Sequence, residues 1–189
     1  MSDLLGSASA PGFDNPLEML LACHGKIQTQ CATLRKLLQH LPSYGCDAQA
    51  QQAAQAILRY FDTAGQNHHD DEEQDLFPCL LATPNTEVHK LIARLLDEHK
   101  ALNAAWQQLR PLLLDIAEGR AAELGIKSVE HFIQVHNCHI SLENTQLLPQ
   151  AAKLLDHMQM EALGRSMAAR RGVVFSNTYW AEQVDDGKN

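Results

Sequence analysis

The stretch Asn67–Pro78, NHHDDEEQDLFP, decides the fold, because it contains two His-x-x-x-Glu pairs in overlapping register. The pairs are His68 with Glu72 and His69 with Glu73. Four residues make about one turn of an α-helix, so both members of a pair lie on the same helical face. An imidazole and a carboxylate on one face are a typical pair of metal ligands.

A second copy of this pattern, HISLENTQLLP, spans residues 139–149. His139 and Glu143 repeat the spacing, and a proline follows at the same offset as in the first copy. Chance would give about 0.6 such pairs in a chain of this composition, whereas the chain has four. The fourth, His157 with Glu161, lies beyond Pro149, and we interpret it as accidental. Two copies on two helices indicate a metal site.

Composition limits the class of protein. The chain has 189 residues, 45% of them hydrophobic, and a net charge of −8. It can bury one sizeable core, and its acidity makes nucleic acid an unfavourable partner. No run of eighteen apolar residues and no signal peptide occur, so we expect neither a membrane span nor export by that route. The five cysteines are odd in number and form no C-x-x-C motif, which favours free thiols in a reducing cytoplasm.

Hydrophobic periodicity predicts an all-α protein. Four amphipathic helices are expected over about residues 15–41, 48–81, 87–118 and 127–158, with short connections and no strand signal. The natural assembly is an up-down-up-down antiparallel four-helix bundle. We divide the chain into a flexible segment 1–14, a bundle domain 15–163 and a tail 164–189. Apolar tail residues such as Tyr179 and Trp180 favour packing on the bundle or on another subunit, so a homo-oligomer is possible.

The helical register brings six polar core residues together. Counted from the inter-helix turns, one histidine on each helix reaches a similar depth, and two glutamates lie one turn away. These residues are His24, His68, Glu72, His99, His139 and Glu143. On the same helical phase, His69 and Glu73 are rotated by about 100°, which places them at a helix boundary or behind the ligands.

Ligand chemistry favours two metal ions. Imidazole and carboxylate ligands without thiolate suit iron, manganese or zinc. We expect His24 and His68 to hold one ion and His99 and His139 the other. The two glutamates and a water-derived oxo or hydroxo oxygen would bridge the ions, leaving each with five ligands and one open position. The competing ferritin-like arrangement needs Glu-x-x-His twice, and no histidine here has Glu three residues before it.

Three segments resemble the hemerythrin-like, or HHE cation-binding, family: HHDDEEQDLFP, LLDEHKAL and FIQVHNCHISLENTQLLP. The resemblance covers about residues 16–171, including GRSMAARRG after the bundle. It implies a non-haem di-iron centre with two iron ions, which binds oxygen. By motif, the family's ligands fall on His24, His68, Glu72, His99, His139 and Glu143.

The chain departs from the oxygen-carrying hemerythrins on its third helix. Those proteins place two histidines four residues apart there, whereas here Leu95 and Asn103 flank His99 at that spacing. The site should therefore be more open, which argues against a pure carrier. His136 stands where many relatives have a tyrosine, and it could be a ligand or could hydrogen-bond near the metals.

Several functions stay open. The first is reversible binding or sensing of dioxygen, or of a related diatomic such as nitric oxide. The second is an enzyme that reduces oxygen, peroxide or nitric oxide, and the sequence does not decide whether the chain is an enzyme. Iron storage, repair under stress and a sensor whose tail meets a partner are further alternatives. Repair relatives usually carry a cysteine-containing N-terminal domain, for which fourteen residues leave no room.

Overall fold

The structure is a computed structural model that describes residues 11–120 and 123–175, and within these ranges it contains helices and no strand. The prediction of an all-α fold is confirmed. The elements, in chain order, are α1 (Pro16–Tyr44), α2 (Ala48–Arg59), η1 (Tyr60–Ala64), α3 (Gly65–Asp71), η2 (Glu72–Leu76), α4 (Phe77–Leu81), α5 (Thr86–Ala117), α6 (Ile126–Leu142), η3 (Glu143–Leu147), α7 (Leu148–Leu154) and α8 (His157–Arg170).

Side-chain caps fix the starts of the principal helices. Asn15 accepts a hydrogen bond from the backbone of Glu18, and Pro16 follows it at the first position of α1. Asp47 caps α2 at 2.8 Å, and Asn85 caps α5 at 3.2 Å. Asp156 forms a reciprocal capping box at the start of α8. Each cap satisfies a backbone N–H that the helix itself leaves unpaired.

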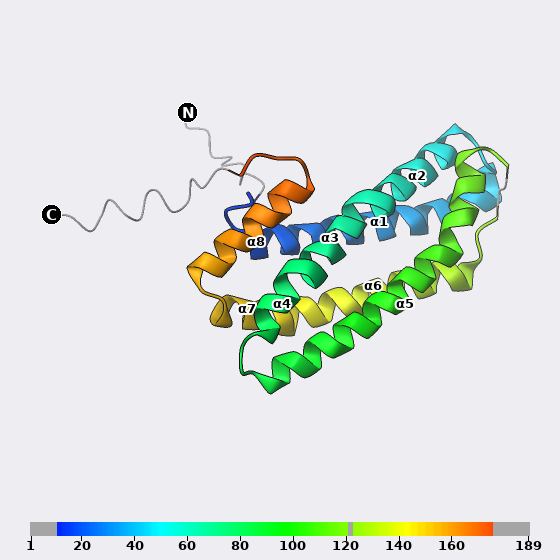
Figure 1. The fold of residues 1–189 in the computed structure, drawn as a ribbon. Helices are drawn as coiled ribbons and strands as arrows, with labels where there is room; N and C mark the ends of the chain where they lie inside the picture. The colour runs from blue at the N-terminus through cyan, green and yellow to red at the C-terminus, as the bar shows by residue number, and fades with distance from the viewer. Residues whose placement is uncertain (1–10, 121–122, 176–189) are drawn as a thin grey trace, which may run out of the picture.

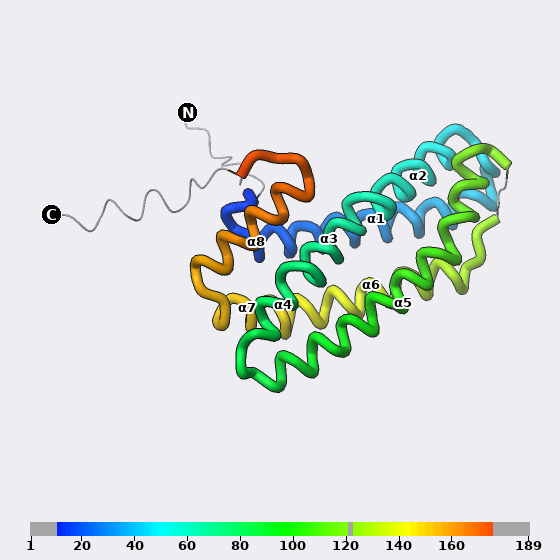
Figure 2. The backbone as a smooth tube through the Cα atoms, viewed as in Figure 1, coloured from blue at the N-terminus to red at the C-terminus, as the bar shows by residue number. Residues whose placement is uncertain are grey.

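The long helices pack side by side, and the backbone reverses direction at the connections between them (Figures 1 and 2). α1 contacts α2 and α6, and α5 also contacts α2 and α6. The run α2–α4 continues through η1 and η2, and the run α6–α7 continues through η3. Among the helices that the structure describes, none combines the length and the apolarity that crossing a bilayer requires.

The interior contains two apolar clusters with polar residues between them. One cluster includes Ile27, Ile57 and Phe132, and the other includes Leu20 and Leu76, all of them buried. On every long helix the predicted ligands lie between residues of these two clusters. Polar side chains buried in this layer need hydrogen-bond or ionic partners, because burying them unpaired costs free energy.

Two segments within the predicted second helix, η1 and η2, are π-helical. The predicted fourth helix also differs, because α7 ends at Leu154 and a separate helix, α8, begins at His157 after the extended residue Leu155. The predicted boundary between the bundle and the tail, at residues 163 and 164, falls within α8, which ends at Arg170. Tyr179 and Trp180 lie outside the described residues.

α8 packs at the end of the bundle against α1, α3 and η2 (Figure 1). Gly164 lies so close to the backbone of Phe13 that a Cβ added there would overlap its carbonyl oxygen. Arg170 and Arg171, at the end of the helix, both bond the carboxylate of Asp71. The helix is thus attached to the segment that carries the first His-x-x-x-Glu pair.

Candidate metal centre

All six predicted ligands lie in the buried layer between the apolar clusters, and none is more than 4% exposed. They come from α1, α3, η2, α5, α6 and η3. Helical register therefore brings together the residues that the sequence singled out: His24, His68, Glu72, His99, His139 and Glu143.

The six residues form two overlapping groups, in each of which one ligand atom per residue lies within 4.8 Å of the others. Both groups contain Glu72 and Glu143. His24 and His68 complete the first group, and the second consists of His99, His139 and the same two glutamates. This grouping has the pairing expected from the sequence. The role of these residues as metal ligands is still a prediction.

Glu143 joins the two groups through its two oxygens. Its Oε2 lies 3.1 Å from Nε2 of His24, and its Oε1 lies 3.2 Å from Nε2 of His139. Because the two imidazoles belong to different groups, the carboxylate has the position of a bridge.

Glu72 makes the equivalent connection. Its Oε1 lies 3.5 Å from Nε2 of His68, and its Oε2 lies 3.4 Å from Nε2 of His99. Each of the two carboxylates thus faces one imidazole from either group.

Several of these atoms are buried yet lack a hydrogen bond within the described part of the chain. They are Nε2 of His24, both ring nitrogens of His68 and all four carboxylate oxygens of Glu72 and Glu143. Apart from Nδ1 of His68, each of these atoms lies 3.1–3.5 Å from an imidazole nitrogen or a carboxylate oxygen of the cluster, without hydrogen-bond geometry. Leaving such groups unpaired costs about 1–3 kcal/mol each, and more for charged groups. The donor set therefore fits cations bound among these atoms.

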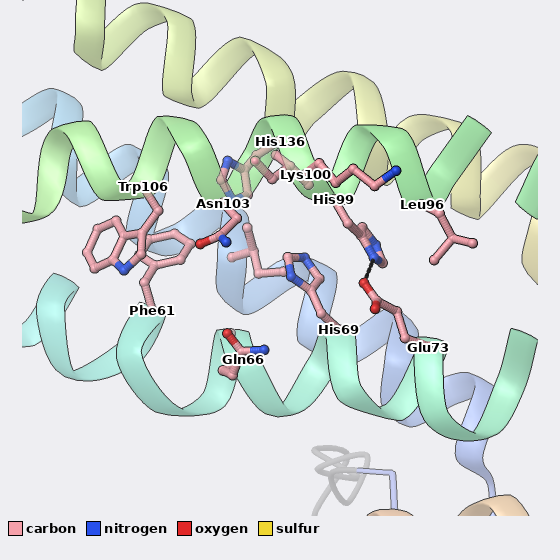
Figure 3. A pocket seen from close by; sticks show the side chains of 13 residues that line it. Phe61, Gln66, His69, Glu73, Leu96, His99, Lys100, Asn103, Trp106 and His136 are labelled. Carbon is pink, nitrogen blue, oxygen red and sulfur yellow. Dashed lines mark hydrogen bonds and ion pairs between the residues drawn. The ribbon is translucent and has the colours of Figure 1, made fainter. Parts of the chain in front are cut away.

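Three of the four imidazoles are oriented through Nδ1. In the neutral ring, Nδ1–H of His24 donates to Oδ1 of Asn144 at 2.6 Å. Nδ1–H of His99 likewise donates to Glu73 at 2.6 Å, as the dashed line in Figure 3 shows. Bonds of this kind fix the tautomer and leave Nε2 as a lone-pair donor for a metal.

His139 completes the pattern through Glu98, whose Oε2 accepts from Nδ1–H at 3.1 Å. Nε2 of His99 and Nε2 of His139 then present lone pairs to each other at a separation of 3.1 Å. Two nitrogens bound at about 2.1 Å and at right angles to one metal would be about 3 Å apart. With both rings neutral, this separation is typical of two ligands that share an ion. Without an ion, Glu143 and Glu98 raise the pKa of His139 against the effect of burial, and a protonated His139 would donate to His99.

Burial controls the protonation of the cluster. It lowers the pKa of His68 to about 3, so this ring is neutral, as a metal ligand must be. Burial and the neighbouring Glu143 raise the pKa of Glu72 well above its ordinary value. Burial also opposes ionisation of Glu143, yet the adjacent imidazoles of His139 and His24 hold its pKa well below the usual range. Without a cation, only one of the two carboxylates is readily ionised.

Both glutamates begin a π-helical turn. The N–H of Phe77 donates to the carbonyl of Glu72, five residues earlier, and the N–H of Leu148 donates likewise to Glu143. A proline follows each turn, and proline has no N–H with which to continue α-helical bonding. π-Turns of this kind occur frequently at functional sites, and here they set the direction of the two carboxylates.

His69 belongs to the cluster in a different way. Its ligand nitrogen groups with those of His99 and His139 but not with the carboxylates. Its ring lies 4.2 Å from the ring of His99, centroid to centroid, in a stacked arrangement. His69 therefore lies beside the second group and forms with His99 and His139 a third group that could hold an ion, and its expected place behind the ligands stays a prediction.

His136 is close to the cluster but in none of the candidate ligand groups among the described residues. Its Nδ1–H donates to the carbonyl of Phe132 at 2.8 Å, and burial lowers its pKa to about 4. With His69 and His99, it lines a cavity of about 320 Å³ (Figure 3).

The sequence analysis did not single out Asn144 and Glu98. Each directly adjoins a predicted ligand, and this polar neighbour was the available signal. Periodicity does not show which neighbouring helix a polar side chain faces. Glu98 on α5 reaches His139 on α6, and Asn144, in the π-turn η3, reaches His24 on α1.

Comparison with known proteins gives two findings. The model of the hemerythrin HHE cation-binding domain matches residues 15–151. A Haemophilus influenzae protein described as uncharacterized is 33% identical over 162 residues, which are 85% of this chain and 92% of that protein. The matched range includes all six predicted ligands.

Proposed function

Because this chain belongs to the hemerythrin HHE cation-binding domain family, we propose that its buried cluster is a di-iron centre that reversibly binds dioxygen or a related diatomic such as nitric oxide. The observation that carries the proposal is the double bridge: Glu72 and Glu143 each face one imidazole of either group, at 3.1–3.5 Å. Carboxylates that each face imidazoles of two different groups favour two ions over one.

In this proposal His24 and His68 hold one iron, and His99 and His139 hold the other. The irons would supply the electrons and the coordination positions with which a diatomic combines. The protein supplies four imidazoles, three of them fixed through Nδ1, and an apolar shell that limits the access of water. His69, stacked on His99, restricts the space beside the second ion.

The proposal includes the antiparallel up-down-up-down bundle over residues 15–163. The packing of α1 and α5 with both α2 and α6 supports this arrangement. We propose that the segments 1–14 and 164–189 are not part of the bundle domain. The segment 164–189 is proposed as the contact of a homo-oligomer. A reducing cytoplasm is the proposed compartment, in keeping with the five free thiols.

An enzymatic alternative is favoured by the cavity beside His99, which is larger than a diatomic needs. In that case the centre would reduce oxygen, peroxide or nitric oxide with electrons from an external donor. Iron storage and repair under stress are the remaining alternatives.

The deciding experiment is metal analysis of anaerobically purified protein, followed by its optical spectrum as air is admitted. We expect two irons per chain and a new charge-transfer band that reverses when oxygen is removed. Consumption of oxygen with added reductant would favour the enzyme. One tightly bound zinc per chain, or a spectrum indifferent to oxygen, would contradict the proposal.

A further inference from the structure

The cavity beside His99 has an apolar inner wall and a polar rim. It lies between α3 and α5, with Phe61 and Trp106 at one end and His99 and Glu73 at the other (Figure 3). Phe61 and Trp106 are each less than a tenth exposed, and their ring centroids are 5.1 Å apart. The aromatic end of the cavity is therefore a packed surface.

His136 offers the cavity an unpartnered acceptor. The residue is 5% exposed and lines the cavity from α6. Its Nδ1–H is already donated to Phe132, so Nε2 of the neutral ring carries a lone pair. No hydrogen bond to this Nε2 comes from any residue that the structure describes. An acceptor that faces a cavity in this way can take a hydrogen bond from a donor outside the protein.

The charged residues of the lining are already engaged. Lys100, at the rim, bonds Asp97 at 2.8 Å, and Glu73 accepts from His99 at 2.6 Å. Neither charge needs a counter-ion in the cavity. The remaining polar groups of the lining are the imidazoles of His136 and His69 and the amides of Gln66 and Asn103. The amides carry no charge and burial lowers the pKa of both imidazoles, which favours a neutral occupant over an anion.

The volume sets the size of that occupant. A dry apolar cavity of about 150 Å³ is enough to bind benzene. The volume here is about 320 Å³, which holds one substituted ring and greatly exceeds a diatomic. An apolar cavity with a few placed polar groups is the usual form of a small-molecule site.

We propose that this cavity binds a small neutral ring compound carrying one O–H or N–H group. Its ring lies against Phe61 and Trp106, and its donor hydrogen-bonds to Nε2 of His136. This inference goes beyond the proposed function, which needs only a diatomic, and it gives the centre a second, organic ligand. The cavity is lined by residues outside the proposed ligand set apart from His99, so the site does not depend on which ion is bound.

The test compares phenol with toluene, which has the same number of heavy atoms and no donor. Calorimetric titration of the full-length, metal-loaded chain should show one site that binds phenol about fivefold or more tightly than toluene, the difference expected for one neutral hydrogen bond. His136→Phe should bring phenol to the affinity of toluene while toluene still binds, which also reports an intact cavity. His131→Phe, an exposed position on the same helix, is the matched control and should leave both affinities unchanged.

Three results would overturn the inference. They are equal affinity for phenol and toluene, binding of neither, and phenol binding that His136→Phe leaves unaltered. Repeating the titration on metal-free protein separates this site from the metals. Phenol that binds only with iron present, and with a new charge-transfer band, would be an iron ligand rather than an occupant of the cavity. Metal content, measured on the same samples, reports independently on the proposed di-iron centre.

Discussion

Arg171 holds Asp71 with both terminal nitrogens, Nη2 to Oδ2 at 2.7 Å and Nη1 to Oδ1 at 3.1 Å. Asp71 is fully buried, and it directly precedes the bridging candidate Glu72. Arg170 bonds the same carboxylate. Through this contact the C-terminal helix α8 is fixed to the segment that orients the candidate metal centre.

Removing the carboxylate should therefore destabilise the fold. Asp71→Ala leaves the largely buried Arg171 without its carboxylate, while Arg170 keeps its bond to Asp75 at 2.7 Å, and the loss should cost about 3 kcal/mol. Urea unfolding of the metal-free protein measures the change. Asp70→Ala, one residue away with only a long exposed hydrogen bond, is the control and should shift stability by less than about 0.5 kcal/mol. Equal effects of the two substitutions would show that the ion pairs contribute little.

Loss of a bridging carboxylate should remove metal. Glu72→Ala or Glu143→Ala deletes one ligand from each of the two groups, so we expect at least one of two metals to be lost per chain. His69→Ala should retain both, because its nitrogen groups only with His99 and His139. Metal analysis after identical loading tests this. A loss in His69→Ala as large as in the glutamate variants would make His69 a ligand.

Asn144 should act through His24. Asn144→Ala removes the acceptor of the Nδ1–H bond, so the ring is no longer held with Nε2 toward the cluster. Substitutions of this kind typically weaken metal binding by about 10- to 100-fold. Chelator competition measures the affinity, and Asn137→Ala, an exposed position on α6, should leave it unchanged. Comparable affinities for the two variants would mean that ring orientation does not depend on this bond.

Two glycines should respond in opposite directions to the same substitution. Gly164→Ala puts a methyl group into the carbonyl of Phe13 and should cost about 1–3 kcal/mol. Gly25→Ala, in the middle of α1 with nothing within 4 Å of the added Cβ, should stabilise by about 0.4–1 kcal/mol. Thermal and urea unfolding compare them. If Gly164→Ala were neutral, the close approach of α8 to the segment before α1 would not exist.

His136 should make the protein sensitive to acid. Its pKa falls from 6.5 to about 4 on folding, so below pH 6.5 the unfolded chain takes up a proton that the folded chain does not. Stability is therefore full above about pH 6.5 and declines as the pH falls toward 4, by at most roughly 3 kcal/mol at 1.36 kcal/mol per pH unit.

The measurement is urea unfolding of metal-free protein between pH 7 and 4, for the wild type and for His136→Phe. Groups common to both proteins cancel in the difference, so the wild type should lose more stability over this range. Parallel pH profiles would show that His136 is charged in the folded state or exposed to water.

Much of the centre could be predicted because helical geometry is regular. A rise of constant length per residue places His68 and His99 at equal depth from the turn that joins their helices, and the spacing of four places each glutamate beside its histidine. The same constant rise places His24 of the first helix at a similar depth, beside the other predicted ligands. These relationships need no knowledge of side-chain packing.

Other features depend on packing that periodicity does not contain. The π-turns at Glu72 and Glu143 add a residue to the helical turn, and only the following prolines signal them. α8 was missed beyond residue 164 because Gly164 and the alanines give it a weak apolar stripe. Asn144 looks like any polar helix residue until its contact with His24 is known.

The bundle consists of two comparable halves, each of which contains one of the π-turns that begin at Glu72 and Glu143. Residues 16–81 contribute His24 and one His-x-x-x-Glu unit, and residues 86–154 contribute His99 and the other. Each hairpin supplies the imidazoles of one group, and they share only their carboxylates. A single hairpin associated with a second copy of itself through a twofold axis would present the same four imidazoles and two carboxylates. The candidate site is therefore composed of two hairpins, each of which supplies two imidazoles and one carboxylate.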